Sequence, residues 1–182
     1  MLPRSNRRPE GIMAATALCC LLDKNRLTYC FIGDSRIYLI RGDSVAVLTR
    51  DHNLKSQLVR TGRSPSQVED IPGANALVRC VGDFERGDDL SIQPVGLRPE
   101  FGEFNLLPGD TVVMCSDGVV DYAGRDEEEA EEKIRRAVVE APGAPWAAFE
   151  LVVLANHGGG GDNISCIVMN FSAKGGAQGS AS

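Results

Sequence analysis

The chain has 182 residues, and its 25 acidic side chains outnumber its 19 lysines and arginines, which gives a net charge of −6 at pH 7. This length suits one domain with a sizeable core, and the acidic balance argues against nucleic acid or an anionic membrane as a partner, because both call for basic patches. No apolar run has the length of a signal peptide or a membrane-spanning helix, so we expect a cytoplasmic protein.

The two ends of the chain read as tails on either side of one domain. Residues 1–10 show no hydrophobic periodicity and include two prolines, which indicates a tail or a cut end. Residues 173–182 are small and glycine-rich, which is typical of a disordered tail. We therefore assign residues 11–172 to a single folded domain.

The six cysteines give no sign of a zinc site. The chain contains no Cys-x-x-Cys pair, and adjacent Cys19 and Cys20 in a predicted strand would face opposite sides of a sheet. Most of the cysteines fall within apolar, strand-like runs, so we expect reduced thiols in the core. The six positions are 19, 20, 30, 80, 115 and 166.

The first part of the chain predicts four strands that follow one another in an antiparallel sheet. Apolar runs at 12–22 and 27–32 are separated by turn residues and predict a hairpin. Runs at 37–40 and 45–49 flank a four-residue loop that contains glycine and predict a second hairpin. We expect these four strands to form one meander.

Further strands are expected later in the chain. Residues 72–89 resemble a loop, and strands are predicted at 90–95, 101–106 and 110–115. The last two are joined by a Leu-Pro-Gly turn, which suggests a second set of β pairings separate from the first. A final strand is predicted at 164–171.

Four segments have the features of helices. Apolar residues at helical spacing predict a short helix at 51–62, and a serine N-cap ahead of a proline predicts a second at 64–70. Residues 126–140 carry acids in the first turns and bases in the later ones, as a helix dipole favours, and residues 145–156 begin with proline in the first turn. Strands thus precede helices rather than alternating with them, which predicts an α+β fold of two packed antiparallel sheets flanked by helices.

Three aspartates stand beside glycine or serine at predicted strand ends. Asp34 follows the run 27–32, Asp117 follows a mostly apolar run, and Asp162 precedes the last strand. We expect Gly118 to turn the backbone so that Asp117 points into a cleft. Carboxylates are ligands for hard divalent cations such as magnesium and manganese, although aspartate and glycine are also common turn residues without any such role.

The segments around these aspartates share a pattern with a known family. In order, the chain reads GDSR around Asp34, CSDG around Asp117 and GGGDN around Asp162. This order resembles the type-2C (PPM-type) metal-dependent protein serine/threonine phosphatases. Residues 48–52 are similar to the family's LTxDH segment and residues 75–82 to its NxLTRxLG segment, so the resemblance spans residues 11–171.

The resemblance implies a fold, an activity and a metal centre. Family members form an αββα sandwich and hydrolyse phosphoserine and phosphothreonine in protein substrates, using water activated by two or three magnesium or manganese ions. It further implies that Asp117 and Asp162 bind the paired metals and that Asp34 and Asp117 hold the third. No catalytic residue is expected beyond these metal ligands, and substrate-binding residues and oligomeric state stay open.

The chain also departs from the family pattern. Neither the family's R…ED segment, which provides a phosphate-binding arginine, nor its DGxGG segment, which provides a bridging aspartate, has a match. Residues 11–172 are therefore expected to be an incomplete phosphatase-like domain that lacks the N-terminal strands and helices of the full fold. Three alternatives remain: part of a longer metal-dependent phosphatase, a catalytically inactive phosphatase-like module that binds proteins, or an unrelated acidic β-rich domain.

Two further residues are given structural interpretations. His52 stands beside a predicted helix start, where a histidine is expected to be a capping or surface residue rather than part of a cleft. Arg36 is expected to form a structural ion pair rather than to touch a substrate. The glycine run 158–161 lacks the GK[ST] sequence of a phosphate-binding P-loop.

Overall fold

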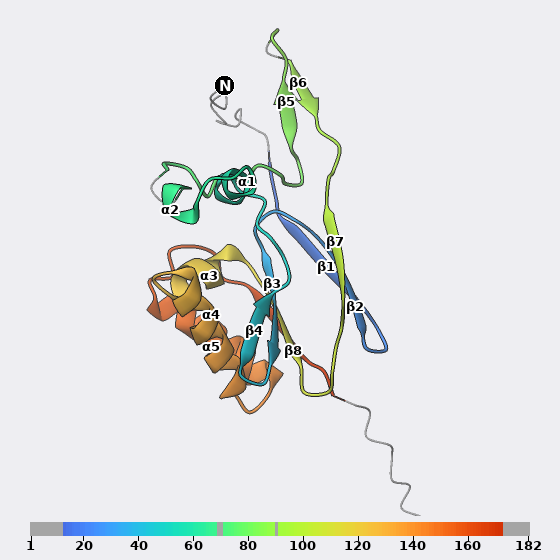
Figure 1. The fold of residues 1–182 in the computed structure, drawn as a ribbon, viewed down its shortest axis with the longest axis vertical. Helices are drawn as coiled ribbons and strands as arrows, with labels where there is room; N and C mark the ends of the chain where they lie inside the picture. Colours follow the sequence, from blue (N-terminus) through green and yellow to red (C-terminus); the bar gives the residue numbers. More distant parts are fainter. Residues whose placement is uncertain (1–12, 69–70, 90, 173–182) are drawn as a thin grey trace, which may run out of the picture.

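The computed structural model describes residues 13–68, 71–89 and 91–172 (Figure 1). These residues form a three-stranded sheet, a four-stranded sheet, a short hairpin and five helices. The predicted tails, residues 1–10 and 173–182, lie outside the described residues.

The three-stranded sheet has the order β1-β2-β7, with neighbours antiparallel. Its strands are β1 (Ala17–Asp23), β2 (Arg26–Ile32) and β7 (Glu100–Asn105). The hairpin between β1 and β2 confirms the first predicted turn, although β1 begins later than the apolar run suggested.

The four-stranded sheet has the order β4-β3-β8-β9 and is also antiparallel throughout. It consists of β3 (Arg36–Arg41), β4 (Ser44–Val47), β8 (Thr111–Cys115) and β9 (Cys166–Asn170). All four strands were expected from their apolar runs.

The predicted assignment of strands to sheets was wrong. The chain changes sheets between β2 and β3, so the first four strands do not form one meander. The later strands do not form a separate set either, because β7 pairs with β2 while β8 pairs with β3. Strands that are buried on both faces show continuous apolar runs, and such runs do not specify the sheet to which a strand belongs.

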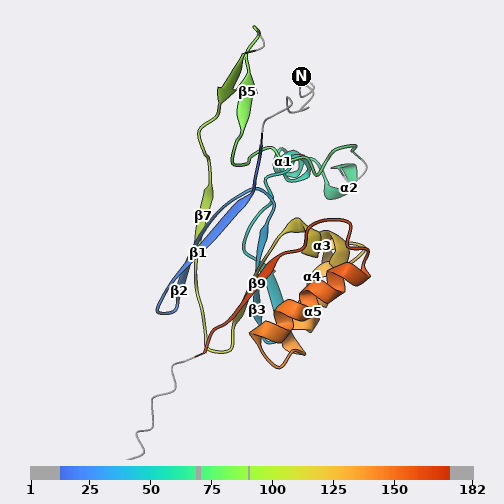
Figure 2. The ribbon, with the colours of Figure 1, turned by 180° about the vertical axis from the view of Figure 1, so that it is seen from behind.

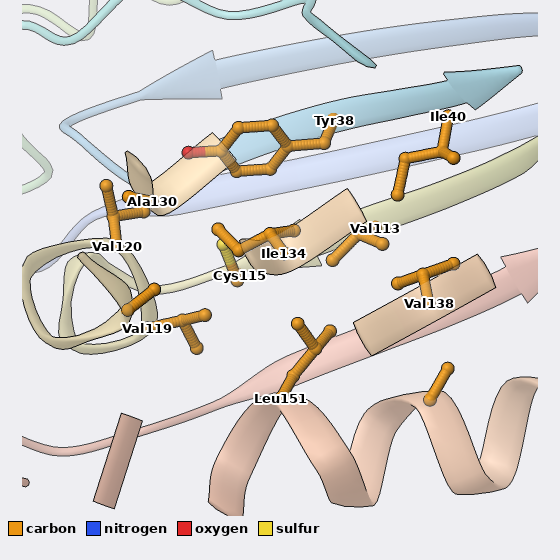
Figure 3. Packing of buried hydrophobic residues seen from close by; sticks show 12 residues of the cluster. Tyr38, Ile40, Val113, Cys115, Val119, Val120, Ala130, Ile134, Val138 and Leu151 are labelled. Carbon is orange, nitrogen blue, oxygen red and sulfur yellow. The ribbon is translucent and has the colours of Figure 1, made fainter. Parts of the chain in front are cut away.

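The four-stranded sheet is covered by three helices, α3 (Asp117–Ala123), α4 (Glu127–Val139) and α5 (Ala144–His157). Seen from behind the view of Figure 1, α5 lies beside β9 (Figure 2). The helices bury a cluster of side chains against the sheet, in which Ile134 and Leu151 are fully buried (Figure 3). Both long helices match their predictions.

A second cluster lies between the two sheets and confirms that they pack face to face. It includes Leu27, Ile37, Leu106 and Val112, all buried. The structure is thus an α+β sandwich of two antiparallel sheets with helices outside, as predicted from the sequence.

The remaining elements lie at one end of the sandwich. They are α1 (Leu54–Arg60), α2 (Pro65–Val68) and a hairpin of β5 (Phe84–Arg86) and β6 (Ile92–Pro94) that projects away from the sheets in Figure 1. Both short helices were expected, but the predicted loop 72–89 ends in a strand. Across the described ranges, no helix combines the length and apolarity needed to cross a bilayer.

Candidate metal centre

A cleft with a volume of about 1010 Å³ lies between α1 on one side and α3 and α4 on the other. Asp34 and Asp117 both line it. Two of the three aspartates selected from the sequence therefore face the same space, although they come from the crossover between the sheets and from the end of β8.

Asp34 lies where the chain crosses from β2 to β3. Gly33 makes this crossing possible, because its φ of 110° is unfavourable for other residues and a side chain there would run into Thr16. Burial, and next the negative charge of Asp117, raise the pKa of Asp34 to about 6. A carboxylate in this position gains from a bound cation, which would remove both penalties.

Asp117 is the first residue of α3, which corrects the expectation of a turn at this point. Ser116 is the N-cap of this helix, and the Gly118 N–H donates to Asp117 Oδ1 at 2.8 Å. Gly118 is needed for a different reason than the one predicted: a side chain here would collide with the carbonyl of Asn163. The absence of a side chain lets α3 lie directly against the loop that carries Asp162.

Asp162 is exposed and directly follows the glycine run 158–161, which packs closely against Tyr122 of α3. Side chains at Gly158 or Gly161 would collide with Tyr122, so the run allows the backbone to pass close to α3. Asp162 Oδ1 accepts a hydrogen bond of 2.6 Å from the Asn163 N–H, and its Cβ would lie 3.6 Å from a Cβ added at Gly118.

The three predicted ligands thus gather around the start of α3 but do not form a complete metal-binding cluster by themselves. Asp34 and Asp117 line the cleft, whereas Asp162 lies beside Gly118. Within the described ranges, no group of three or more histidine, cysteine, aspartate or glutamate side chains is arranged to hold a metal. Their assignment as ligands therefore stays a prediction.

Sequence analysis missed a fourth carboxylate, Asp121, which also lines the cleft one turn after Asp117 on α3. Its pKa is raised, first by loss of surrounding water and then by the charge of Asp117, with Asp162 among the smaller causes. The signal was the spacing of four residues, which places two side chains on one helix face. Because no helix was predicted at 117–123, that spacing was not used.

Arg36 has the structural role that was expected. Its guanidinium donates to both carboxylate oxygens of Asp51, at 2.9 and 2.7 Å, and to Glu127 of α4 at 3.2 Å. This bidentate pair fixes the wall of the cleft next to Asp34. Lys55 of α1 approaches the same Glu127 at 3.8 Å, so the two sides of the cleft are linked at one point.

His52 is not a capping or surface residue, so that interpretation was wrong. Its side chain is only about 3% exposed and stacks on Phe31. His52 Nδ1 accepts a hydrogen bond from the Gly33 N–H at 3.1 Å, and the His52 N–H donates to the Gly33 carbonyl at 2.9 Å. Burial, followed by the charge of Arg79, lowers the pKa of His52, which favours the neutral ring that this acceptor role requires. His52 thus fixes the crossover that presents Asp34.

The residues at this site fit a hard divalent cation. Such cations take oxygen ligands, and magnesium is commonly held by one or two carboxylates with water filling the other positions. Asp34 and Asp117 provide carboxylates in a cleft with ample room for water. Burial, and next the charge of Asp117, disfavour the ionised form of Asp34, and a bound cation would offset this cost.

Comparison with known proteins gives a consistent result. The family model described as "Protein phosphatase 2C" matches residues 3–164. The phosphatase PhpP of Streptococcus pneumoniae is 30% identical over 163 residues, which cover 89% of this chain and 59% of PhpP. The chain thus spans less than two thirds of the length of this relative.

Solved structures show the same similarity. A crystal structure of the serine/threonine phosphatase PstP/Ppp of Mycobacterium tuberculosis matches with a TM-score of 0.69 and 28% identity, covering 85% of this chain and 58% of that one. A structure of the PstP catalytic domain in complex with two manganese ions matches with a TM-score of 0.64 at the same identity, covering 85% of this chain and 57% of that one.

Proposed function

Because this chain belongs to the protein phosphatase 2C family, we propose that it acts in the hydrolysis of phosphoserine and phosphothreonine in protein substrates, with bound divalent cations. The observation that carries this proposal is the pair Asp34 and Asp117 in one cleft, with Asp162 beside Gly118. We propose these three aspartates as the metal ligands within this chain. Manganese in the similar PstP structure supports manganese or magnesium as the cation.

The chemistry assigns different tasks to the cations and to the chain. When bound, divalent cations activate water and balance the charge of a phosphoryl group. The chain itself supplies carboxylates whose positions are fixed before a cation binds. Asp34 lies on a crossover held by His52, and Asp117 lies at the N-terminus of α3. Arg36 and Asp51 keep the neighbouring wall in place.

The open cleft suits a protein substrate. Its α1 side carries Arg50 and Lys55, and Arg50 is exposed with no ion-pair partner among the residues that the structure describes. A phosphate group entering between α1 and α3 would therefore meet cationic side chains on one wall and the proposed metal site on the other.

We also propose a cytoplasmic location. Cys115 and Cys166 face each other across β8 and β9, and Cys19 and Cys30 do so across β1 and β2. The chain has no Cys-x-x-Cys pair and most of its cysteines fall in apolar, strand-like runs, so we interpret them as the reduced thiols of a reducing compartment.

The test measures metal binding and turnover separately. Calorimetric titration of residues 1–182 with manganese should show loose binding, on the order of 1 mM, because few charged ligands are present. Asp117→Asn should remove the heat of binding, whereas Asp43→Asn, at a fully exposed turn away from the cleft, should leave it unchanged. Equal heats for Asp117→Asn and the parent chain would contradict the metal assignment.

Turnover is followed as phosphate release from a phosphothreonine peptide with manganese, with and without a chelator. We expect slow, chelator-sensitive release by the chain as given, because the sequence has no match to the family's DGxGG segment. Fusion to that segment from a longer family member should raise the rate, and Asp162→Asn in the fusion should abolish the gain. A fusion with no metal-dependent turnover would contradict the proposed function and favour the inactive binding module.

A further inference from the structure

A second hollow, of about 430 Å³, lies on the other side of α1 from the candidate metal centre. Three arginines line it and come from separate parts of the chain: Arg60 at the end of α1, Arg79 between α2 and β5, and Arg98 before β7. None of these side chains belongs to the proposed metal site. A concentration of guanidinium groups in one hollow is a typical setting for an oxyanion.

The charges in this hollow do not cancel. Arg60 and Arg79 share a single carboxylate oxygen, Glu100 Oε1, at 3.4 and 2.9 Å. Arg98 is exposed and has no ion-pair partner within the described part of the chain. The one acid that lines the hollow, Asp51, has both oxygens occupied by Arg36. Three guanidinium groups therefore face one shared carboxylate, which leaves an excess of positive charge.

A buried polar atom at the base of the hollow points to the same conclusion. His52 lines the hollow, and its Nε2 is buried without a well-directed hydrogen bond. The nearest acceptor is Glu100 Oε1, 3.3 Å away and already shared by the two arginines. An oxyanion bound in the hollow would accept hydrogen bonds from these groups, which now all depend on Glu100 Oε1.

The hollow adjoins the cleft. Asp51 and Arg60 line both, so the two spaces meet along α1. A peptide whose phosphorylated side chain lies near Asp34 and Asp117 can place a neighbouring residue over this second hollow.

We propose that the hollow around Arg60, Arg79 and Arg98, which we call the arginine hollow, binds a second anionic group of the phosphoprotein substrate. This inference rests on the proposed function, since it assigns a substrate preference to the same site. The chemistry is that of an oxyanion, provided by an aspartate or glutamate carboxylate or by a second phosphate. Substrates with acidic or multiply phosphorylated sequences would then be preferred over neutral ones.

The test uses binding in the presence of a chelator, so that it does not depend on catalysis. Fluorescence anisotropy is measured for residues 1–182 with three labelled peptides that contain one phosphothreonine and differ in the flanking residues: glutamates, glutamines, or one additional phosphoserine. We expect the glutamate and bis-phosphorylated peptides to bind more tightly than the glutamine peptide. If the glutamate peptide shows the larger gain in affinity over the glutamine peptide, carboxylate is the preferred oxyanion. If the bis-phosphorylated peptide shows the larger gain, phosphate is preferred.

Arg98→Ala should weaken binding of the preferred anionic peptide roughly tenfold, the effect of losing one charge-assisted contact, and should leave the glutamine peptide unchanged. Arg63→Ala is the matched control, because Arg63 is exposed and lines neither space. Equal affinity for all three peptides, or equal losses in the two variants, would overturn the proposal. Retained Arg98-dependent binding without any turnover would instead contradict the phosphatase function and leave the arginine hollow in place.

Discussion

The two sheets of this molecule have very different outer faces. The outer face of β4-β3-β8-β9 is covered by α3, α4 and α5, and Leu151 of α5 is 0% exposed. On the outer face of β1-β2-β7, Leu21 and Phe101 are 69% and 72% exposed. Both sheets nevertheless contribute to the core between them.

The difference shows which half of the molecule fixes the site. Asp117 follows β8 directly and begins a helix that packs on the covered sheet, so its position depends on the larger core. Asp34 lies between the two sheets and depends on both. The helix-covered, four-stranded sheet therefore fixes the position of Asp117, while the three-stranded sheet contributes mainly the side chains of its inner face to the core between the sheets.

The largest effect is expected when leucine is replaced by alanine at one position on each side of this comparison. Leu151→Ala should lower the free energy of unfolding by about 3 to 4 kcal/mol, because a fully buried leucine leaves a cavity between α5 and the sheet. Leu21→Ala should change it by less than about 0.5 kcal/mol, as for other exposed positions. Urea denaturation followed by circular dichroism measures both.

A large loss for Leu21→Ala would show that the outer face of β1-β2-β7 is covered in solution. Because both variants remove the same atoms, the difference between them reports mainly burial, with a smaller contribution from the different propensity of alanine for a helix and a strand.

A smaller effect is expected at the connection between the sheets. Asp110, which is 1% exposed, receives two hydrogen bonds of 2.7 Å from Arg41 of β3 and one from the Leu107 N–H after β7. Asp110→Asn should cost about 1 to 2 kcal/mol in urea denaturation, because the buried carboxylate loses its charge-assisted hydrogen bonds to Arg41, whose own side chain is 42% exposed. The matched variant is Asp43→Asn, at a fully exposed carboxylate, which should cost less than about 0.5 kcal/mol.

The Asp110 effect should depend on pH. The Arg41 hydrogen bond lowers the pKa of Asp110, so its stabilising contribution is present at neutral pH and is lost as pH falls through that lowered pKa. A cost of Asp110→Asn that stays constant down to pH 2 would argue against the ion pair as its cause.

The smallest effect is expected at the crossover itself. The pKa of Asp34 is raised to about 6 by burial and by Asp117, so its ionised form destabilises the metal-free fold. Asp34→Asn should therefore be more stable than the parent chain above pH 6 in the presence of a chelator. This advantage should shrink as pH falls from 6 towards 4, where the parent carboxyl becomes protonated. An advantage that grows on acidification would contradict the sign of this pKa shift.

Much of the local structure could be predicted from the sequence. Helix α4 has an aspartate N-cap, an acidic first turn and an apolar stripe, and its observed ends agree closely with the prediction. The strands of the two sheets were predicted from apolar runs, whereas β5 was missed. The sheet to which each strand belongs could not be predicted, since it depends on the turn at Gly33 and on pairings between distant parts of the chain.

The site was predicted only in part, for similar reasons. The motifs led to Asp34, Asp117 and Asp162, but helix α3 was missed because it is only seven residues long and its N-cap and first two residues read Ser-Asp-Gly, a sequence typical of turns. Missing α3 also meant missing Asp121. The burial of His52 could not be read from its neighbours in sequence, because its partners Gly33 and Glu100 lie far away along the chain.

The contact between Gly118 and the carbonyl of Asn163 has a consequence for protein engineering. Two motifs that are distant in sequence meet here through their main chains, without an intervening side chain whose length could be adjusted. A designer who wished to transfer this carboxylate arrangement to another scaffold would have to move the start of α3 and the loop 158–163 together as one graft. Replacing either piece separately would change the spacing between Asp117 and Asp162, even if every ligand residue were retained.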